Sequence, residues 1–468
     1  MLSRETFFLP ARELGRRLRA GEFSSLELTL GYIERLRTVG AGLNAVVTVC
    51  EARALDEARA ADHELRSGRA RGPLHGVPYG VKDLLAARGA PTTWGAEPYR
   101  DQVFDFDATV VARLHAAGCV IVAKLAMVEL AGGMGYDEAD ASFTGPGLTP
   151  WNTGFWSGGS SSGPAAAVAS GCVGFAIGSE TSGSILTPSA FCGVSGLRPT
   201  YGLVSRHGAM ALSWTLDKLG PMCRTADDCG LVLETIAGHD DADDTSVRHR
   251  FHWNAAARSG RKLRIAVPKG CSEKVQPAVR DNFEASLDAM ADWITVERDV
   301  VWPDFPWGPA VGTIVNAEGA AAFLPLIESG DAQQLRCAAD QIGGYSGLHT
   351  FAVDYIQALR ARAPMQRAVN ALFDKYDAFA SPARASVSYP VGKKFRDAYP
   401  DVRSGPGLIP AGNLCGLPAV CVPNGFGDNN LPTSIAFLGA AFSEPLLLGL
   451  ATTHQRATDW HRKSPPVH

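Results

Sequence analysis

Hydrophobic positions near the start of the chain recur at helical spacing. An apolar stripe consists of Leu26, Leu30 and Ile33. Ser24 precedes the stripe, and Glu27 stands three residues after that serine. A serine and a glutamate at this distance can form a capping box, in which each side chain bonds a free backbone N–H group of the first helical turn. We therefore expect the chain to open with amphipathic helices.

Short apolar segments alternate with helical patterns in the next part of the chain. Residues 77–81 and 120–123 predict short buried strands, and residues 108–117 predict a helix between them. The stretch 164–178 is rich in alanine and glycine and is too short to cross a bilayer comfortably. It predicts a buried helix that runs into a strand. This alternation indicates an α/β fold whose sheet is covered on its faces.

The rest of the chain carries the same mixture of patterns. Strands are predicted over 263–267 and 419–422, and helices over 277–291, 313–326 and 350–376. Residues 239–262 are polar and contain two pairs of aspartates, so we expect an exposed connection there. Because there is no internal repeat and no convincing linker, we predict a single domain over 1–468, with a catalytic core over about 65–235.

Composition narrows the classes of function. The 468 residues carry a net charge of −4 and no long run of Lys or Arg, which argues against nucleic-acid or anionic-membrane binding. The ten cysteines form no Cys-x-x-Cys pair, and no secretory signal is evident, so we expect reduced thiols and a cytoplasmic protein. His249 and His252 lie in a polar loop without further ligands, which favours a solvated loop over a metal site.

Two glycine-rich serine loops and one lysine carry the candidate chemistry. The first loop, residues 157–163, has the sequence SGGSSSG, and the second, residues 181–185, has the sequence TSGSI. Ser184 therefore stands 24 residues after Ser160. Lys82 precedes Ser160 by 78 residues. The combination points to acyl transfer to water, with a serine as the attacking group.

Each serine loop is followed by a predicted helix. The first helix is expected to begin at Pro164 with Ser162 as its cap, and the second to begin near Thr187. Free backbone N–H groups and the helix dipole at such N-termini favour developing negative charge.

A lysine can deprotonate a serine only if the lysine itself is neutral. Burial lowers the pKa of a lysine, and the apolar neighbours Val81 and Leu84 make Lys82 a candidate for that role. For each of these features taken alone, an ordinary structural alternative remains open. Lys82 could be a surface lysine paired with Asp83, and each serine loop could be a simple Gly/Ser turn.

Several blocks of sequence resemble the amidase signature family, and together they cover most of the chain. They are 76–83, 107–111 with 116–118, 150–152 leading into 158–161, 191–202 and 413–419. The resemblance implies a single large domain with a central mixed, twisted β-sheet covered by helices on both faces. It also implies hydrolysis of C–N bonds without a cofactor or a metal.

The resemblance assigns a role to each candidate residue. Ser184 would be the nucleophile and would carry the acyl group. Ser160 would follow a cis peptide bond with Gly159 and relay a proton between Ser184 and Lys82. The oxyanion hole would consist of four backbone N–H groups, those of Thr181, Ser182, Gly183 and Ser184.

The chain departs from the family pattern at two positions. Glu180 stands where the family often has Asp, and Leu186 stands where it often has Arg. An acidic and basic pair near the site is thus altered on both sides, and one consequence would be a more apolar pocket.

The substrate class follows less directly. The resemblance implies a small-molecule amide, and aryl carbamates also suit the same machinery, as in urethanases. We take Ala131, Tyr136 and Trp214 as candidate substrate-binding residues. Further aromatic residues could line an apolar pocket, although most such residues belong to a core: Trp94, Trp151, Phe155 and Trp156. A monomer or a homodimer is expected.

Three other hypotheses compete. The glutamine-hydrolysing A subunit of a tRNA-dependent amidotransferase resembles the central blocks, but residues 343–363 do not show the segment expected for binding glutamine, and 408–410 lack the usual acidic residue. An α/β-hydrolase would use Ser161 in a Gly-x-Ser-x-Gly elbow, which needs a strand directly before it and a downstream histidine. A non-catalytic binding protein is disfavoured because Lys82, Ser160 and Ser184 are all present.

Overall fold

The computed structural model describes residues 2–254, 261–403, 405 and 408–466. Within these residues the strands are β1 (Val46–Val49), β2 (Pro78–Lys82), β3 (Val120–Leu125), β4 (Phe175–Glu180), β5 (Ser195–Arg198), β6 (Lys218–Cys223), β7 (Leu263–Pro268), β8 (Ile294–Val300), β9 (Ala378–Pro382), β10 (Ala419–Phe426) and β11 (Pro432–Leu438). The α-helices are α1 (Ala11–Arg19), α2 (Ser25–Arg35), α3 (Glu51–Arg66), α4 (Thr109–Ala116), α5 (Ser162–Ala169), α6 (Leu186–Cys192), α7 (Ala226–Ile236), α8 (Pro277–Ala289), α9 (Trp307–Ala322), α10 (Leu324–Ser329), α11 (Ala338–Gly347), α12 (Ala352–Asn370), α13 (Phe395–Ala398), α14 (Leu408–Leu414) and α15 (Glu444–Ala457).

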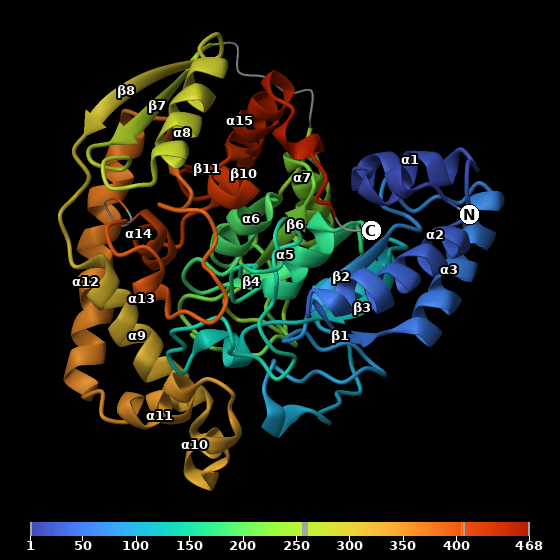
Figure 1. The fold of residues 1–468 in the computed structure, drawn as a ribbon, viewed down its shortest axis with the longest axis horizontal. Coiled ribbons are helices and arrows are strands. Elements are labelled where there is room, and N and C mark those ends of the chain that lie inside the picture. The colour runs from blue at the N-terminus through green and yellow to red at the C-terminus, as the bar shows by residue number, and fades with distance from the viewer. Residues whose placement is uncertain (1, 255–260, 404, 406–407, 467–468) are drawn as a thin grey trace.

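The strands of the described residues form one sheet of eleven strands. Their order is β1-β3-β2-β4-β6-β5-β10-β11-β9-β7-β8. The pairs β2–β3, β2–β4, β7–β8 and β7–β9 are parallel, and the other six neighbouring pairs are antiparallel. Helices flank the sheet (Figure 1), which confirms the predicted single α/β domain with a central mixed sheet.

Most elements around the serine loops lie where the hydrophobic pattern predicts them. Strands β2 and β3 and helix α4 match their expected ranges to within two residues. Helix α5, however, begins at Ser162 rather than at Pro164. Ser162 is therefore not a cap, and its hydroxyl instead donates to the carbonyl oxygen of Ala126 at 3.3 Å. Helix α6 begins at Leu186, close to the expected start near Thr187.

Helix α2 is capped as expected but buries a different face. Ser24 accepts a hydrogen bond from the N–H of Glu27 at 3.0 Å, and its own N–H donates to the Glu27 carboxylate at 2.8 Å. Leu28 and Tyr32 are fully buried, whereas Leu30 is 48% exposed. Residues four apart share a helix face, so Leu28 and Tyr32 face the core while Leu30 points away. The predicted stripe is therefore wrong at Leu30.

The polar connection predicted over 239–262 is described only in part, because residues 255–260 lie outside the described residues. Its described remainder contains no helix or strand. It is not wholly exposed, since Asp243 is buried and the Asp240 carboxylate accepts a hydrogen bond from the Ser205 hydroxyl at 2.5 Å. These aspartates hold part of the connection against the body of the protein.

Two further expectations concern the whole chain. All ten cysteines lie in the described ranges and are free thiols, nine of them buried, so the prediction of no disulfide framework is confirmed. Among the helices of the described residues, none is both long enough and apolar enough to cross a membrane.

Candidate active site

Two neighbouring parallel strands, β2 and β4, bring candidate residues together at their carboxyl-terminal ends. Lys82 is the last residue of β2, and the loop that contains Ser184 follows β4, which pairs in parallel with β2. Ser160 lies in the loop before α5. The ammonium nitrogen of Lys82 donates to the hydroxyl oxygen of Ser160 at 2.7 Å. The carboxyl ends of parallel strands thus join residues that are far apart in sequence.

Lys82 is fully buried, and burial lowers its pKa from 10.5 to about 7. The negative charges of Asp217 and Glu180 oppose this shift but do not cancel it. Its nitrogen also donates to the Ser179 hydroxyl oxygen at 2.9 Å. With that pKa, about half of the Lys82 side chains are neutral near pH 7. A neutral amine can accept a proton from a serine hydroxyl.

The alternative of a surface lysine paired with Asp83 is wrong. Asp83 is fully buried, and its carboxylate lies 2.8 Å from the ammonium nitrogen of Lys124. The same carboxylate accepts the backbone N–H of Thr93 at 3.0 Å. A buried carboxylate needs such partners. Asp83 therefore leaves Lys82 free to bond the two serines.

Hydrogen bonds hold the two serine loops together. The peptide bond between Gly159 and Ser160 is cis, as the resemblance implies. The backbone N–H of Ser161 donates to the carbonyl oxygen of Ser184 at 3.2 Å. The Ser161 hydroxyl donates to the carbonyl oxygen of Ser179 at 3.1 Å. Ser160 is thereby fixed next to the loop that carries Ser184.

The loop over 181–184 offers unused backbone donors. In the described part of the chain, the N–H groups of these four residues have no hydrogen-bond acceptor, and the Ser184 hydroxyl has no partner. Ser184 is 9% exposed. Gly183 has a φ of +97°, a region that side-chain-bearing residues rarely adopt. The loop can therefore present several N–H groups to one oxygen atom.

The structure shows what the Glu180 and Leu186 departures do. One oxygen of the Glu180 carboxylate accepts the N–H groups of Ile185 at 2.9 Å and Leu186 at 3.0 Å, at the start of α6. The other oxygen pairs with the Arg198 guanidinium at 2.9 Å, and both side chains are fully buried. The acidic residue thus keeps a cationic partner, which comes from β5. The Leu186 side chain packs in an apolar cluster instead.

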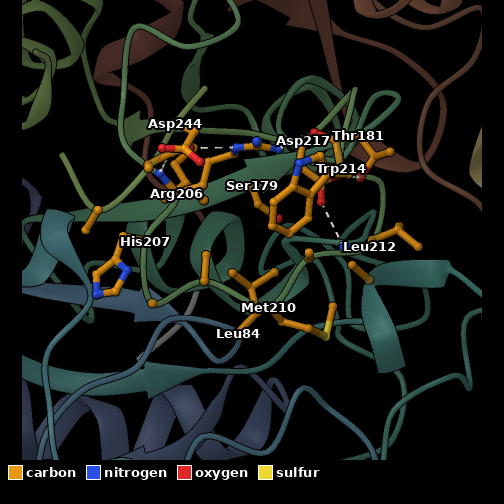
Figure 2. A pocket seen from close by; sticks show the side chains of 17 residues that line it. Leu84, Ser179, Thr181, Arg206, His207, Met210, Leu212, Trp214, Asp217 and Asp244 are labelled. Carbon is orange, nitrogen blue, oxygen red and sulfur yellow. Dashed lines mark hydrogen bonds and ion pairs between the residues drawn. The ribbon is translucent and has the colours of Figure 1, made fainter. Parts of the chain in front are cut away.

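A cavity of about 310 Å³ opens beside the end of β4 (Figure 2). Ser179 and Thr181 contribute to its wall, which is otherwise mainly apolar: Leu84, Ala131, Ala209, Met210, Leu212, Trp214 and Leu219. In Figure 2 Arg206, His207 and Asp244 lie together on one side, away from Thr181. Two of the three candidate substrate-binding residues, Ala131 and Trp214, therefore line a cavity that borders the loop carrying Ser184.

A second cavity, of about 440 Å³, borders the same loop at Ser182. Its wall comes from α9, the end of β9 and α14, and includes Val311, Val315, Pro382, Ala383, Leu408 and Ile409. Arg384 is the one charged residue that lines it among those described. The sequence did not predict this cavity, because its residues come from separate segments without a motif.

Tyr136, the third candidate substrate-binding residue, does not line either cavity. Its ring packs edge-on against Trp156 and Phe395, with ring centres 6.1 Å and 5.6 Å away. Trp151 donates its indole N–H to the carbonyl oxygen of Cys192 at 2.8 Å. These aromatic residues stabilise packing, as most aromatic residues do.

The sequence did not predict two polar residues at the site. Ser179 bonds Lys82 directly, and its place just before the second serine loop was the available signal. Asp217 accepts a hydrogen bond from the Thr181 hydroxyl at 2.5 Å and another from the N–H of Leu212 at 2.8 Å. It thereby fixes the loop, but no motif marks it in the sequence.

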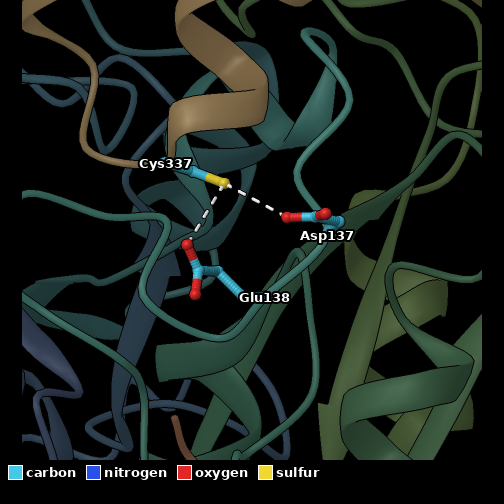
Figure 3. A group of neighbouring side chains, drawn as sticks. All are labelled: Asp137, Glu138 and Cys337. Atoms are coloured by element: carbon cyan, nitrogen blue, oxygen red, sulfur yellow. Dashed lines mark hydrogen bonds between the residues drawn. The ribbon is translucent and has the colours of Figure 1, made fainter. Parts of the chain in front are cut away.

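A separate acidic group also went unpredicted. Asp137, Glu138 and Cys337 bring their potential ligand atoms within 4.8 Å of one another (Figure 3). The Cys337 thiol donates to both carboxylates at 3.9 Å, and burial raises the pKa of this thiol. Asp137 also pairs with Lys394 at 2.7 Å. A protonated thiol and an ion pair account for this group.

The α/β-hydrolase hypothesis is contradicted by the local backbone. In the described structure, residues 151–161 contain no strand, and α5 follows directly. A nucleophile elbow places its serine between a strand and a helix. Ser161 therefore does not occupy such an elbow.

Comparison with known proteins adds independent evidence. A model of the Amidase family matches residues 27–448. The A subunit of the glutamyl-tRNA(Gln) amidotransferase of Methylococcus capsulatus is 36% identical over 479 residues, which covers 97% of this chain and 98% of the relative. The native peptide amidase of Stenotrophomonas maltophilia has a TM-score of 0.86 and 29% identity, with 98% of both chains covered. The corresponding amidotransferase chain of Thermotoga maritima has a TM-score of 0.81 and 26% identity, with 98% of this chain and 97% of that chain covered.

By sequence similarity, these relatives favour the amidotransferase chain over a stand-alone amide or carbamate hydrolase. The carbamate hypothesis has no support among them. The coarser conclusion does not depend on that choice, because the family model spans most of the chain. The chain belongs to the amidase signature family and is a serine hydrolase that cleaves C–N bonds.

Proposed function

We propose that this protein hydrolyses amides through an acyl-enzyme on Ser184, with Ser160 as proton relay and Lys82 as base. One observation carries the proposal. Lys82 is fully buried with a pKa of about 7, and it is hydrogen-bonded to Ser160 at 2.7 Å. A lysine with an ordinary pKa would be almost entirely protonated at neutral pH and could not accept a proton.

The proton moves along the chain of three residues. As the Ser184 oxygen attacks the carbonyl carbon, its proton passes to the Ser160 oxygen, and the Ser160 proton passes to neutral Lys82. The protonated lysine then returns a proton through Ser160 to the leaving nitrogen, and the amine departs. Water attacks the remaining ester, gives up a proton by the same path, and releases the carboxylic acid.

The N–H groups of Thr181, Ser182, Gly183 and Ser184 stabilise the oxyanion in this proposal. Their lack of acceptors in the described structure supports that role. The hydrogen bond from Thr181 to Asp217 holds the loop in place before substrate arrives. A single donor of this kind contributes about 10²- to 10³-fold to the rate in related chemistry.

We infer that the substrates are amides with largely apolar substituents. Both cavities that border the loop, at Thr181 and at Ser182, have mainly apolar walls. Apolar walls favour aryl or alkyl groups over charged or strongly hydrated ones. Aryl carbamates also have a carbonyl carbon bonded to nitrogen and carry an aryl group. They form the second substrate class to test.

A second candidate function is the glutamine-hydrolysing A subunit of an amidotransferase. The 36% identity over nearly the whole chain favours it. The second cavity does not suit glutamine, because its described residues include no carboxylate to pair with the ammonium group. The first cavity, at the same loop, contains Asp244 beside Arg206 and could pair with both charged groups of glutamine.

Activity of the isolated chain distinguishes the two candidates. The purified protein would be incubated with neutral anilides, aryl esters, aryl carbamates and L-glutamine, beside Ser184→Ala and Ser162→Ala. We expect anilide turnover that disappears in Ser184→Ala and persists in Ser162→Ala, whose hydroxyl bonds only a backbone carbonyl. Turnover of glutamine alone would favour the amidotransferase role, and turnover that survives Ser184→Ala would contradict the proposed nucleophile.

A further inference from the structure

Arg384 has few partners for a largely enclosed arginine. It follows β9 and lines the cavity that borders Ser182. One of its terminal nitrogens donates to the Tyr389 hydroxyl at 3.1 Å, and the guanidinium lies 5.8 Å from the centre of the Phe191 ring. Its Nε is buried and has no hydrogen-bond partner among the described residues. A guanidinium has five N–H donors, so most of them remain available.

Other arginines around the site are more fully paired. Arg198 forms a buried ion pair with Glu180 at 2.9 Å. Arg206, in the first cavity, lies 3.9 Å from a carboxylate oxygen of Asp243 and donates to a backbone carbonyl at 2.7 Å. Arg362 donates to two backbone carbonyl oxygens, at 2.5 Å and 3.1 Å. Arg384, by contrast, has no carboxylate within ion-pair distance among the described residues. It lines the cavity at Ser182 and also a smaller adjoining cavity that contains Tyr389.

The surroundings of Arg384 favour an anion. The described lining of its cavity is mainly apolar, with Val311, Val315 and Ile409, and contains no acidic side chain. In such surroundings an unpaired positive charge attracts a negative one more strongly than it would in water. The guanidinium fork also matches the two oxygens of a carboxylate, which an ammonium group cannot match in the same way.

We propose that Arg384 binds a terminal carboxylate of the substrate, so that the preferred amides combine an apolar body with one carboxylate end. This rests on the proposed function, because the cavity is assigned to substrate through its contact with the Ser182 loop. The apolar wall would contact the apolar part of the substrate. Arg384 would bind its terminal carboxylate and so fix the position of the substrate in the cavity.

Matched pairs of ligands test the proposal independently of turnover. Glutaric acid mono-4-nitroanilide and 5-oxohexanoic acid 4-nitroanilide differ only in carboxylate against methyl ketone at the acyl end. 4-Acetamidobenzoate and 4-acetamidoacetophenone differ in the same way at the amine end. Binding of all four to the Ser184→Ala protein would be measured by calorimetry. We expect the carboxylate of at least one pair to bind about 10- to 100-fold more tightly than its ketone.

Variants at Arg384 locate that preference. Arg384→Gln should remove it and leave ketone binding within about threefold, whereas Arg384→Lys should keep part of it. The matched control is Arg396→Gln, because Arg396 shares the smaller cavity with Arg384 but does not line the cavity at Ser182, and its side chain is 78% exposed. If Arg384→Gln does not fold, the proposal is still tested by binding of the ligand pairs to the Arg384→Lys variant and to the protein that keeps Arg384.

The outcomes separate this proposal from the proposed function. Equal binding of carboxylate and ketone in both pairs would overturn the role of Arg384, even if neutral anilides are hydrolysed. A preference that persists in Arg384→Gln would do the same. A carboxylate preference that depends on Arg384, without turnover of any amide by the unaltered enzyme, would support the binding site while the proposed reaction fails.

Discussion

Removing the Ser179 hydroxyl tests how the protein sets the pKa of Lys82. The Lys82 ammonium donates to two hydroxyl oxygens, those of Ser160 at 2.7 Å and Ser179 at 2.9 Å. Ser179→Ala takes one of these acceptors from the charged lysine and leaves the burial unchanged. The charged form should therefore become less stable, and the pKa of Lys82 should fall below its value of about 7.

The size of this fall follows from the contact that is lost. A hydrogen bond to a charged group contributes about 1.5–3 kcal/mol, and one pKa unit corresponds to about 1.4 kcal/mol. The pKa of Lys82 should therefore fall by about one to two units in Ser179→Ala. Burial itself has the larger effect, since a shift from 10.5 to about 7 corresponds to about 5 kcal/mol against the charged lysine.

The assay is the pH dependence of kcat/KM for a neutral anilide, because this ratio reports groups of the free enzyme. The unaltered enzyme should gain activity as the pH rises, with a midpoint near 7. In Ser179→Ala the midpoint should lie about one unit lower or more, and Ser179→Thr, which keeps the hydroxyl, should retain the original midpoint. A flat profile, or a midpoint that Ser179→Ala does not move, would refute this reasoning.

Three further predictions follow from buried charges and from backbone geometry. Lys82→Met should raise the free energy of unfolding in urea at pH 7 by about 3 kcal/mol. This value is the cost of about 5 kcal/mol for the charged lysine less about 2 kcal/mol for its lost hydrogen bonds to Ser160 and Ser179. Because the folded pKa is depressed, the cost of the charge is full below about pH 7 and falls to zero as the pH rises to 10.5. The gain should therefore shrink over this range and become a small loss at its upper end. Glu180→Gln should lower the free energy of unfolding in urea by about 3–5 kcal/mol, since Arg198 is left unpaired. Gly183→Ala should lower kcat about 100-fold in steady-state assays with little change in KM, because φ is +97° there.

The local pattern of the sequence predicts the elements that carry the chemistry. Strand β2, helix α5 and strand β4 could be inferred from short apolar runs that end in Lys82 or lead into the serine loops. Catalytic roles could be proposed for Ser160, Ser184 and Lys82 because these residues stand in blocks that resemble a known family. These features depend on contiguous residues, which a single sequence displays directly.

Strands that depend on their neighbours were harder to predict. Strand β6 (Lys218–Cys223) contains lysine, glycine and proline, residues with low preference for strands. It forms because β4 and β5 pair with it on either side. Tertiary contacts thus outweigh local preference, and no periodic pattern marks the strand.

The substrate side of the site was the least predictable part. Asp217 holds Thr181 from 36 residues away, and Arg384, which follows β9, lines the cavity that Ser182 also lines. Tyr136 was expected at the substrate but packs against Trp156 and Phe395 instead. Cavity walls combine residues from separate segments, and only the fold shows which side chains meet.

Trapping the acyl-enzyme tests the central claim most directly. The protein would be mixed with an activated aryl ester, quenched in acid within milliseconds to seconds, and examined by intact and peptide mass spectrometry. Our account predicts one added acyl group, located on Ser184, that does not form in Ser184→Ala and forms more slowly below pH 7 than above it. An acyl group on Ser160 or Ser161, or hydrolysis that continues in Ser184→Ala, would contradict the account.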